Sequence, residues 1–149
     1  MASWAKKTAA ALAAFALLAA PAAAQVPDPF ARELAQKLAR AELILSDDGY
    51  ARAAGPFAGG LREGEGRRFT VTLRAGQDYR IVGVCDNRCR DLDLRLHDPN
   101  ARMVAEDVLE DAAPIIHVRP YATGQYAIEA IMHGCSAAPC WFAFNVYSR

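Results

Sequence analysis

Short runs in which apolar and polar residues alternate begin near residue 69 and continue almost to the end of the chain. A period of two places successive side chains on opposite faces of a β-strand, and Gly, Pro, Asn and Asp residues mark turns between the runs. Strands are predicted at residues 69–74, 79–84, 92–96, 103–107, 115–118, 124–132 and 141–147. This pattern predicts a mainly β fold, an antiparallel β-sandwich of seven or eight strands.

Two of these strands, at residues 79–84 and 141–147, are apolar on both faces. A sandwich strand with a solvated outer face shows polar residues at every second position. Both strands are therefore predicted to be central, with the second face covered by another element. The segment 29–45 is the predicted cover, because Asp28 is a typical N-cap, Pro29 is a typical first-turn residue, and apolar residues follow at helical spacing.

Residues 1–24 have the features of a secretory signal peptide. Lys6 and Lys7 precede an apolar stretch at residues 8–20, and three alanines at residues 22–24 form a small-residue cleavage site. The apolar stretch is shorter than the roughly 20 residues that span a bilayer, and no cysteine follows the cleavage site to carry a lipid. We therefore expect an exported protein without a membrane span, released into the periplasm or the medium.

The expected mature chain, residues 25–149, has the length of one folded unit. It divides into an N-terminal helix at residues 25–48, an irregular connection at 49–66 that is rich in Gly and Ala, and a β-sandwich domain at 67–149. The full chain has 17 basic and 17 acidic residues, for a formal net charge of zero. This balance argues against a nucleic acid as a partner.

Four cysteines, Cys85, Cys89, Cys135 and Cys140, lie in the expected mature chain. An oxidising compartment allows them to pair, and four cysteines permit three connectivities. Local pairing, 85 with 89 and 135 with 140, is predicted. Because a disulfide needs Cα atoms within about 7 Å, the chain has to turn inside each pair, which predicts two stapled hairpins; a turn at residues 75–77 predicts a third hairpin. The alternative is a structural zinc site with four thiolate ligands.

Three stretches carry a resemblance: RRFTVTLRAGQDYRIVG, DLDLRLHDPNARMVAED and IIHVRPYATGQYAIEAIM. With their Ala-Gly turn, Asp-Leu-Asp-Leu strand, Asp-Pro-Asn turn and late Thr-Gly-x-Tyr strand, they are similar to the bacterial pre-peptidase C-terminal (PPC-like) domain over roughly residues 61–147. The resemblance implies a jelly-roll β-sandwich without catalytic activity, sometimes involved in binding polymers or surfaces. We expect a stand-alone exported member, which departs from the family in its helix, its cysteine pairs and Ala101, where the family has Gly.

The densest group of oxygen donors consists of Asp91, Asp93, Asp98, Asn100 and Asp107. Calcium takes six to eight such oxygens, and some relatives of the resembled family bind calcium, so a calcium-stabilised module is one hypothesis. The alternative is that Asp91 and Asp93 form the solvated face of a strand while Asp98 and Asn100 are ordinary turn residues. No other cofactor is expected.

Catalytic constellations are weak by comparison. The three histidines, His97, His117 and His133, lie on or beside different predicted strands and are expected to be surface residues. No Gly-x-Ser-x-Gly motif is present. The acids at residues 106–111 would be the route to a secreted hydrolase, although a run of acids between strands is ordinarily solvated. We therefore expect a protein without enzyme activity.

Trp141, Tyr147 and Tyr121 are the candidate binding residues, because exposed aromatic rings stack on sugars or anchor proteins. Trp141 and Tyr147 share one strand face, which the predicted helix would bury. The sequence thus predicts an exported, non-catalytic binding or accessory module whose ligand is an envelope protein or polymer.

Overall fold

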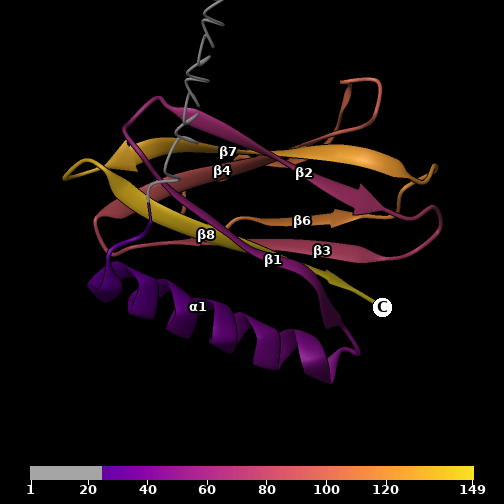
Figure 1. The fold of residues 1–149 in the computed structure, drawn as a ribbon, viewed down its shortest axis with the longest axis horizontal. Helices are drawn as coiled ribbons and strands as arrows, with labels where there is room; N and C mark the ends of the chain where they lie inside the picture. The colour runs from indigo at the N-terminus through magenta and orange to yellow at the C-terminus, as the bar shows by residue number, and fades with distance from the viewer. Residues whose placement is uncertain (1–24) are drawn as a thin grey trace, which may run out of the picture.

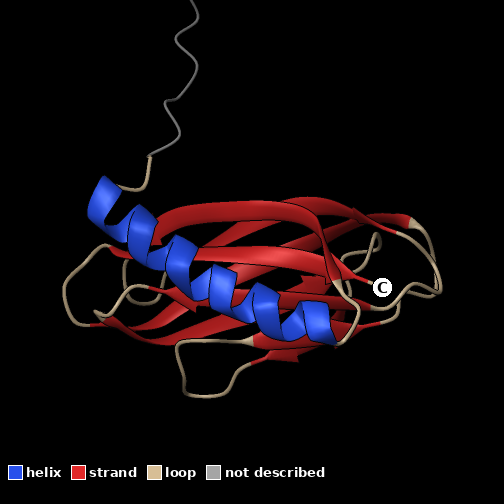
Figure 2. Ribbon diagram, turned by 90° about the horizontal axis from the view of Figure 1, so that it is seen from below, coloured by secondary structure: helices blue, strands red, loops and turns tan. Residues whose placement is uncertain are grey.

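The computed structural model describes residues 25–149, so the predicted signal peptide at residues 1–24 lies outside the described part of the chain. One helix and eight strands form three layers, with the helix on one face of a two-sheet sandwich (Figure 1 and Figure 2). The elements are α1 (Asp28–Asp47), β1 (Ala51–Leu61), β2 (Gly66–Leu73), β3 (Tyr79–Cys85), β4 (Cys89–His97), β5 (Met103–Asp107), β6 (Ile115–Val118), β7 (Gly124–Cys135) and β8 (Cys140–Ser148). Within residues 25–149, no helix combines the length and apolar composition that a membrane crossing requires.

The two sheets each contain four antiparallel strands. The covered sheet, on which α1 lies, has the order β1-β8-β3-β6, and the outer sheet has the order β2-β7-β4-β5. Of the strands that are consecutive in sequence, only β4 and β5 pair with each other, and every other connection crosses between the sheets. The hairpins predicted at residues 75–77 and at both cysteine pairs are therefore wrong. An alternating sequence shows where a strand ends, but it does not show whether the chain then pairs with the same sheet or crosses to the other sheet. A hairpin was predicted because strands that are consecutive in sequence usually lie next to each other.

α1 crosses β3 and β8, the two central strands of the covered sheet. Leu34 and Leu38 pack with Val84 of β3 and Ala143 of β8. Near the C-terminal end of α1, Leu45 packs on the same two strands. The predicted cover is confirmed: β3 and β8 are apolar on both faces because one face meets the outer sheet and the other meets α1.

The N-terminal end of α1 differs slightly from the prediction. Pro27 occupies the N-cap position without a side-chain hydrogen bond, and Asp28 is the first helical residue rather than the cap. An acid in the first turn still interacts favourably with the helix dipole, and Pro29 lies in the first turn as expected.

Residues 51–61 form β1, an edge strand, where an irregular connection at 49–66 was predicted. β1 pairs with β8 with register shifts on both sides of Ala54, and Pro56 is tolerated because an edge strand can dispense with a backbone donor. Small residues are required by the packing on β8: a Cβ at Gly60 would lie 2.8 Å from the ring of Trp141. The Gly and Ala residues of this segment therefore allow the close packing of a strand. The prediction of a loop was wrong because a high Gly and Ala content is also typical of irregular connections.

The main core lies between the sheets and consists of the inward side chains of both. Leu92, Leu94 and Leu96 of β4 are fully buried, as their alternation predicted. Phe69 of β2 meets Phe144 of β8 edge to face, with 5.2 Å between ring centroids, so aromatic contacts bridge the two sheets.

Both predicted disulfides are present, Cys85 with Cys89 and Cys135 with Cys140, with Cα separations of 5.9 and 5.8 Å. All four cysteines are paired, so the zinc alternative is wrong. Cys89 and Cys135 lie opposite each other on β4 and β7, which places both bonds at the same end of the sandwich, in the β3–β4 and β7–β8 connections, two of those that cross between the sheets. Two disulfides fit an oxidising, exported compartment.

The carboxylate of Asp86, which is 1% exposed, ties these two crossing loops together. It accepts hydrogen bonds from the backbone N–H groups of Arg88 (2.9 Å) and Trp141 (2.6 Å) and from the Arg88 guanidinium (2.9 Å). Burial by itself would raise the pKa of Asp86, but these hydrogen bonds hold the pKa below its usual value. The buried charge is thus satisfied by donors from the β3–β4 loop and from the start of β8.

Removing a contact between α1 and the covered sheet should destabilise the fold. Leu45→Ala opens a cavity against Val82 and Tyr147 and is expected to lower the free energy of unfolding by about 2–5 kcal/mol in urea denaturation. The neighbouring Ile44 is 68% exposed, so Ile44→Ala, the matched control, should change it by less than about 0.5 kcal/mol. Equal effects of the two substitutions would contradict the docking of α1.

Candidate functional site

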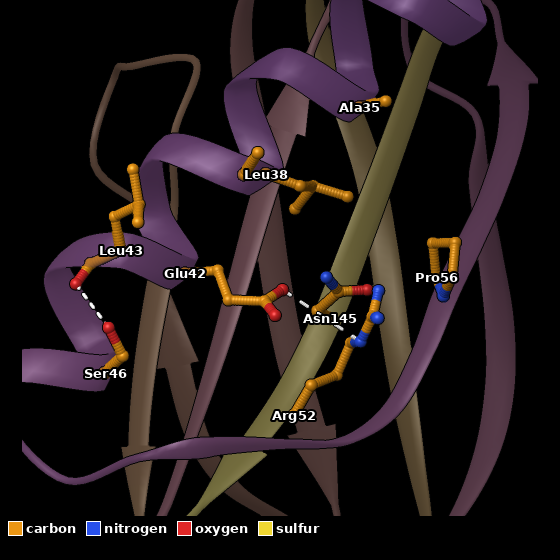
Figure 3. Close-up of a pocket in the computed structure, with 9 residues that line it drawn as sticks. Ala35, Leu38, Glu42, Leu43, Ser46, Arg52, Pro56 and Asn145 are labelled. Carbon is orange, nitrogen blue, oxygen red and sulfur yellow. Dashed lines mark hydrogen bonds and ion pairs between the residues drawn. The ribbon is translucent and has the colours of Figure 1, made fainter.

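A groove of about 560 Å³ lies between α1 and β1, above β8 (Figure 3). It exists because α1 packs mainly over β3 and β8, which leaves part of the face near the edge strand β1 uncovered. The residues that line the groove are Ala35, Leu38, Ala39, Glu42, Leu43, Ser46, Arg52, Pro56 and Asn145. α1 therefore forms one wall, β1 forms the other, and β8 forms the floor.

The helix wall is built from one stripe of α1. Ala35, Ala39 and Leu43 are spaced four residues apart, which places them one above another on the same helix face, and Leu38 is buried at the base. Two alanines keep this wall low. Leu43 is 70% exposed.

Asn145 of β8 forms the polar floor (Figure 3). The residue is 1% exposed, and its Nδ2 donates a hydrogen bond to the Tyr147 hydroxyl at 3.0 Å. Its Oδ1 is buried and accepts no hydrogen bond from any described residue. The amide fits against β1 because Gly55 has no side chain: a Cβ there would lie 2.5 Å from Oδ1. Most buried polar atoms have a partner, so this oxygen is an unpaired acceptor beneath the groove floor, on the side that faces Gly55 of β1.

Glu42 and Arg52 flank the polar end of the groove from opposite walls (Figure 3). Glu42 Oε2 and Arg52 Nε are 4.0 Å apart, and the side chains of Glu42 and Arg52 are 41% and 46% exposed. An ion pair this long and this exposed contributes little to stability. Both charges therefore remain available to a ligand.

The groove continues into a smaller cavity of about 240 Å³ with an apolar lining. The two cavities share Ala35, Leu38 and Pro56. The other residues of the apolar cavity are Val26, Ala31, Leu34, Ala58 and Ala143. The combined surface thus has an apolar end and a polar end.

The three aromatic residues predicted to bind a ligand have different surroundings. Tyr147 is fully buried beneath α1, so it belongs to the core. Trp141 is half-buried beside the apolar end of the groove, where its ring lies 6.3 Å from the ring of Phe30. Tyr121 is 64% exposed, but its hydroxyl donates to Asp98 Oδ2 at 2.7 Å. The structure brings only Trp141 of the three next to the groove.

Sequence reasoning missed Asn145. The signal was a single amide within WFAFNVY, a strand that is otherwise apolar on both faces. A polar side chain at such a position is buried, and burial requires either an internal partner or another reason for its presence. Gly55, which admits the amide, fell in the segment interpreted as irregular.

The five oxygen donors considered for calcium do not converge. Asp91 and Asp93 lie on β4, whereas Asp98 and Asn100 follow its end; five residues of extended chain between Asp93 and Asp98 cover roughly 16 Å. The carboxylate of Asp107 accepts hydrogen bonds from two backbone N–H groups of its own loop. Within residues 25–149, no three His, Cys, Asp or Glu side chains are arranged to hold a metal ion.

The histidines considered for catalysis are also separated. His97 pairs with Glu129 at 3.2 Å, and His133 pairs with Asp93 at 3.0 Å, both on the outer sheet. His117 lies on β6 in the covered sheet and is exposed. No zinc site can be built from three side chains placed in this way.

Asp98 instead has a structural role in the turn after β4. It is 3% exposed and accepts hydrogen bonds from the Tyr121 hydroxyl and from the backbone N–H groups of Asn100 and Arg102. These bonds, the one from Tyr121 first, lower the pKa of Asp98 from 3.8 to about 2. Because the pKa of Asp98 is lower in the folded state than in the unfolded state, the ionised carboxylate stabilises the fold at every pH above the unfolded-state pKa. This contribution is lost as the pH falls through the folded-state pKa of about 2.

Asp98→Asn should reduce the dependence of the melting temperature on pH at acidic pH. The variant is expected to melt below the wild type near pH 5, and the difference should shrink as the pH falls toward about 2, because the wild-type carboxylate is then protonated. Thermal melts across this pH range measure the difference in melting temperature between the variant and the wild type. Asp47→Asn, at an exposed acid of α1, is the control and should follow the wild-type profile. Parallel profiles for Asp98→Asn and the wild type would contradict the assigned role.

No family model matches this chain, and no curated protein matches it. The resemblance to PPC-like domains therefore depends on the sequence motifs alone. The function has to be inferred from the geometry of the groove and from the residues that line it.

Proposed function

We propose that this protein is an exported, non-catalytic binding module whose ligand, a protein or polymer of the cell envelope, occupies the groove between α1 and β1. The observation that carries the proposal is the buried Oδ1 of Asn145, which has no donor among the described residues. Leaving a buried acceptor unpaired costs about 1–3 kcal/mol. The oxygen is buried against β1, so the amide would have to turn toward the groove to accept a hydrogen bond from a ligand N–H or O–H group. That bond would remove the cost, and ligand binding therefore gives a reason for the polar floor.

The two ends of the groove suit a ligand with both apolar and hydrogen-bonding parts. The apolar end offers Leu34 and Leu38, with Trp141 beside it, and the polar end offers Asn145 and the charges of Glu42 and Arg52. Binding sites commonly combine an apolar lining with a few polar groups that fix orientation. Sugar rings and peptide segments both present apolar carbon next to N–H or O–H donors.

The lining of the groove supports binding without chemistry. Glu42 is the one carboxylate among the described residues that line it, and glycoside hydrolysis uses a pair. Ser46 donates its hydroxyl hydrogen bond to the Leu43 carbonyl at 2.8 Å (Figure 3), and no histidine lies in the lining to activate it.

Export and family membership belong to the same proposal. The leader-like sequence of residues 1–24 and the two disulfides support export. We also propose a jelly-roll topology, because the orders β1-β8-β3-β6 and β2-β7-β4-β5 distribute successive strands between the two sheets as two Greek keys would. That topology supports a stand-alone PPC-like module.

Trp141 provides a signal for ligand binding, because it is the only tryptophan in residues 25–149. Titration with soluble peptidoglycan fragments, envelope polysaccharide or envelope protein extract is expected to shift its emission, with saturation by one of the three. Ala39→Phe, which narrows the groove from the helix wall, should weaken that binding at least about tenfold. Gln36→Phe places the same ring on an exposed site of α1 outside the groove and should bind as the wild type does. The proposal is contradicted if none of the three ligands changes the tryptophan emission, or if both variants weaken ligand binding equally.

The double variant Asn145→Leu, Tyr147→Phe separates ligand binding from stability. It replaces both partners of the buried hydrogen bond with apolar groups of similar shape and removes the unpaired oxygen. We expect its free energy of unfolding to equal or exceed that of the wild type, while ligand affinity falls at least about tenfold. A loss of stability above about 1 kcal/mol would mean that the polar pair supports the fold rather than the ligand.

A further inference from the structure

A second exposed surface lies at the edge of the covered sheet opposite the groove. Of the eight large apolar side chains that are well exposed in residues 25–149, six fall within residues 103–121. These six, here called the edge patch, are Met103, Val104, Val108, Leu109, Ile115 and Tyr121. Val108 and Leu109 are adjacent after the C-terminal end of β5, whereas Met103 and Tyr121 lie at its other end, beside His97 and Asp98. Adjacent exposed apolar side chains are typical of an interaction surface, whereas scattered ones are not.

The edge patch follows the two strands that end the sheets on one side. β5 is the last strand of the outer sheet, β6 is the last strand of the covered sheet, and the two strands contact each other. β1, which borders the groove, is the opposite edge of the covered sheet. An edge strand leaves one row of backbone groups without a strand partner, although the Ile115 N–H at the start of β6 is bonded to Asp107.

The loop between β5 and β6 displays Val108 and Leu109 although it is held in place. The carboxylate of Asp107 accepts hydrogen bonds from the backbone N–H groups of Leu109 (3.1 Å) and Ile115 (2.8 Å) and so joins the two ends of the loop. The second half of the loop is hydrogen-bonded to β4 and β3, and Ala112 packs against the main core. Two apolar side chains are therefore presented to solvent by an anchored loop, where burial against a partner would be favourable.

The loop end of the edge patch is acidic. Four carboxylates fall within residues 106–111, and one of them, Glu110, lines a neighbouring cavity of about 440 Å³ together with Glu63 and Asp91. Arg90 and His133 are the basic groups of that lining. Carboxylates thus outnumber full positive charges beside the exposed apolar side chains.

The buried Asp93 is affected by these charges. Burial is the largest cause that raises its pKa, and His133, at 3.0 Å, opposes the rise. The negative charges of Asp91 and Asp107 raise the pKa of Asp93 further. The carboxylates of this region therefore repel one another, and a cation brought close to them would relieve the repulsion.

We propose that the edge patch docks a segment of a partner protein in which apolar side chains stand next to a lysine or arginine. The apolar side chains cover Val108 and Leu109, and the basic group enters the cavity formed by Glu63, Asp91 and Glu110. This surface is independent of the groove, so the proposal does not depend on the ligand proposed there. The two edges of the covered sheet would give one module two different partners.

Charge selects this partner over the other occupants of an apolar surface. A second copy of the chain would bring identical carboxylates together, which repel at short range. An anionic membrane would likewise be repelled by the acids around Val108 and Leu109. A basic, apolar protein segment is attracted by the same acids, and that attraction should weaken as salt screens it.

Binding of a short fluorescent peptide that alternates valine and lysine tests the proposal with the purified protein. We expect saturable binding by fluorescence anisotropy, lost at least about tenfold when sodium chloride rises from about 0.05 to about 0.5 M. Peptides that alternate valine with glutamate, or serine with lysine, should bind at least about tenfold more weakly. Leu109→Ser and Glu110→Gln should each weaken binding of the valine–lysine peptide while leaving the melting temperature unchanged.

Ile44→Ser is the matched control, because Ile44 lies on α1 outside the groove lining and is exposed as fully as Leu109, 68% against 67%. It should bind the valine–lysine peptide as the wild type does. The proposal is overturned by any of four results: no binding of the valine–lysine peptide up to about 1 mM, equal binding of the valine–glutamate peptide, equal effects of Ile44→Ser and Leu109→Ser, or tighter binding to anionic phospholipid vesicles than to the peptide.

Discussion

The contact between α1 and the covered sheet is the interaction on which the rest of this structure depends. Leu34, Leu38 and Leu45 cover a face of β3 and β8 that would otherwise meet water, and apolar burial is the main favourable term in folding. The same contact creates the groove, because a helix that lies over the two central strands cannot also cover β1. Stability and the candidate binding surface therefore have one origin, which is the position of α1 across the sheet.

The disulfides, in contrast, fix the local shape of two loops. Each closes a loop of only a few residues, and a short loop removes little chain entropy when it is closed. Their value lies in fixing two loops that cross between the sheets at the same end of the sandwich. Asp86 joins those loops through hydrogen bonds to Arg88 and to the backbone of Trp141, and a buried charge is acceptable there because its donors are already in place.

The two edges of the covered sheet differ in chemistry. At β1 the small residues of the strand and the alanines of α1 leave a groove above one buried oxygen, Asn145 Oδ1, that has no donor among the described residues. At β6 the neighbouring loop carries apolar side chains among carboxylates. We propose a ligand with apolar and hydrogen-bonding parts for the first surface and a basic, apolar protein segment for the second. A sandwich arranged in this way suits a protein that joins partners through its surfaces.

The sequence by itself determined the mainly β fold, the helix and the role of that helix as a cover, and it favoured the local pairing of the cysteines that the structure contains. These features depend on local periodicity, as at residues 92–96, or on short separations, as between Cys85 and Cys89. Only the tertiary structure decided that the turn at residues 75–77 crosses between sheets and that residues 51–61 form a strand. It also decided that Asn145 is buried with an unpaired oxygen. Strand pairing, close packing and burial depend on residues far apart in the chain, which meet only when the fold is complete.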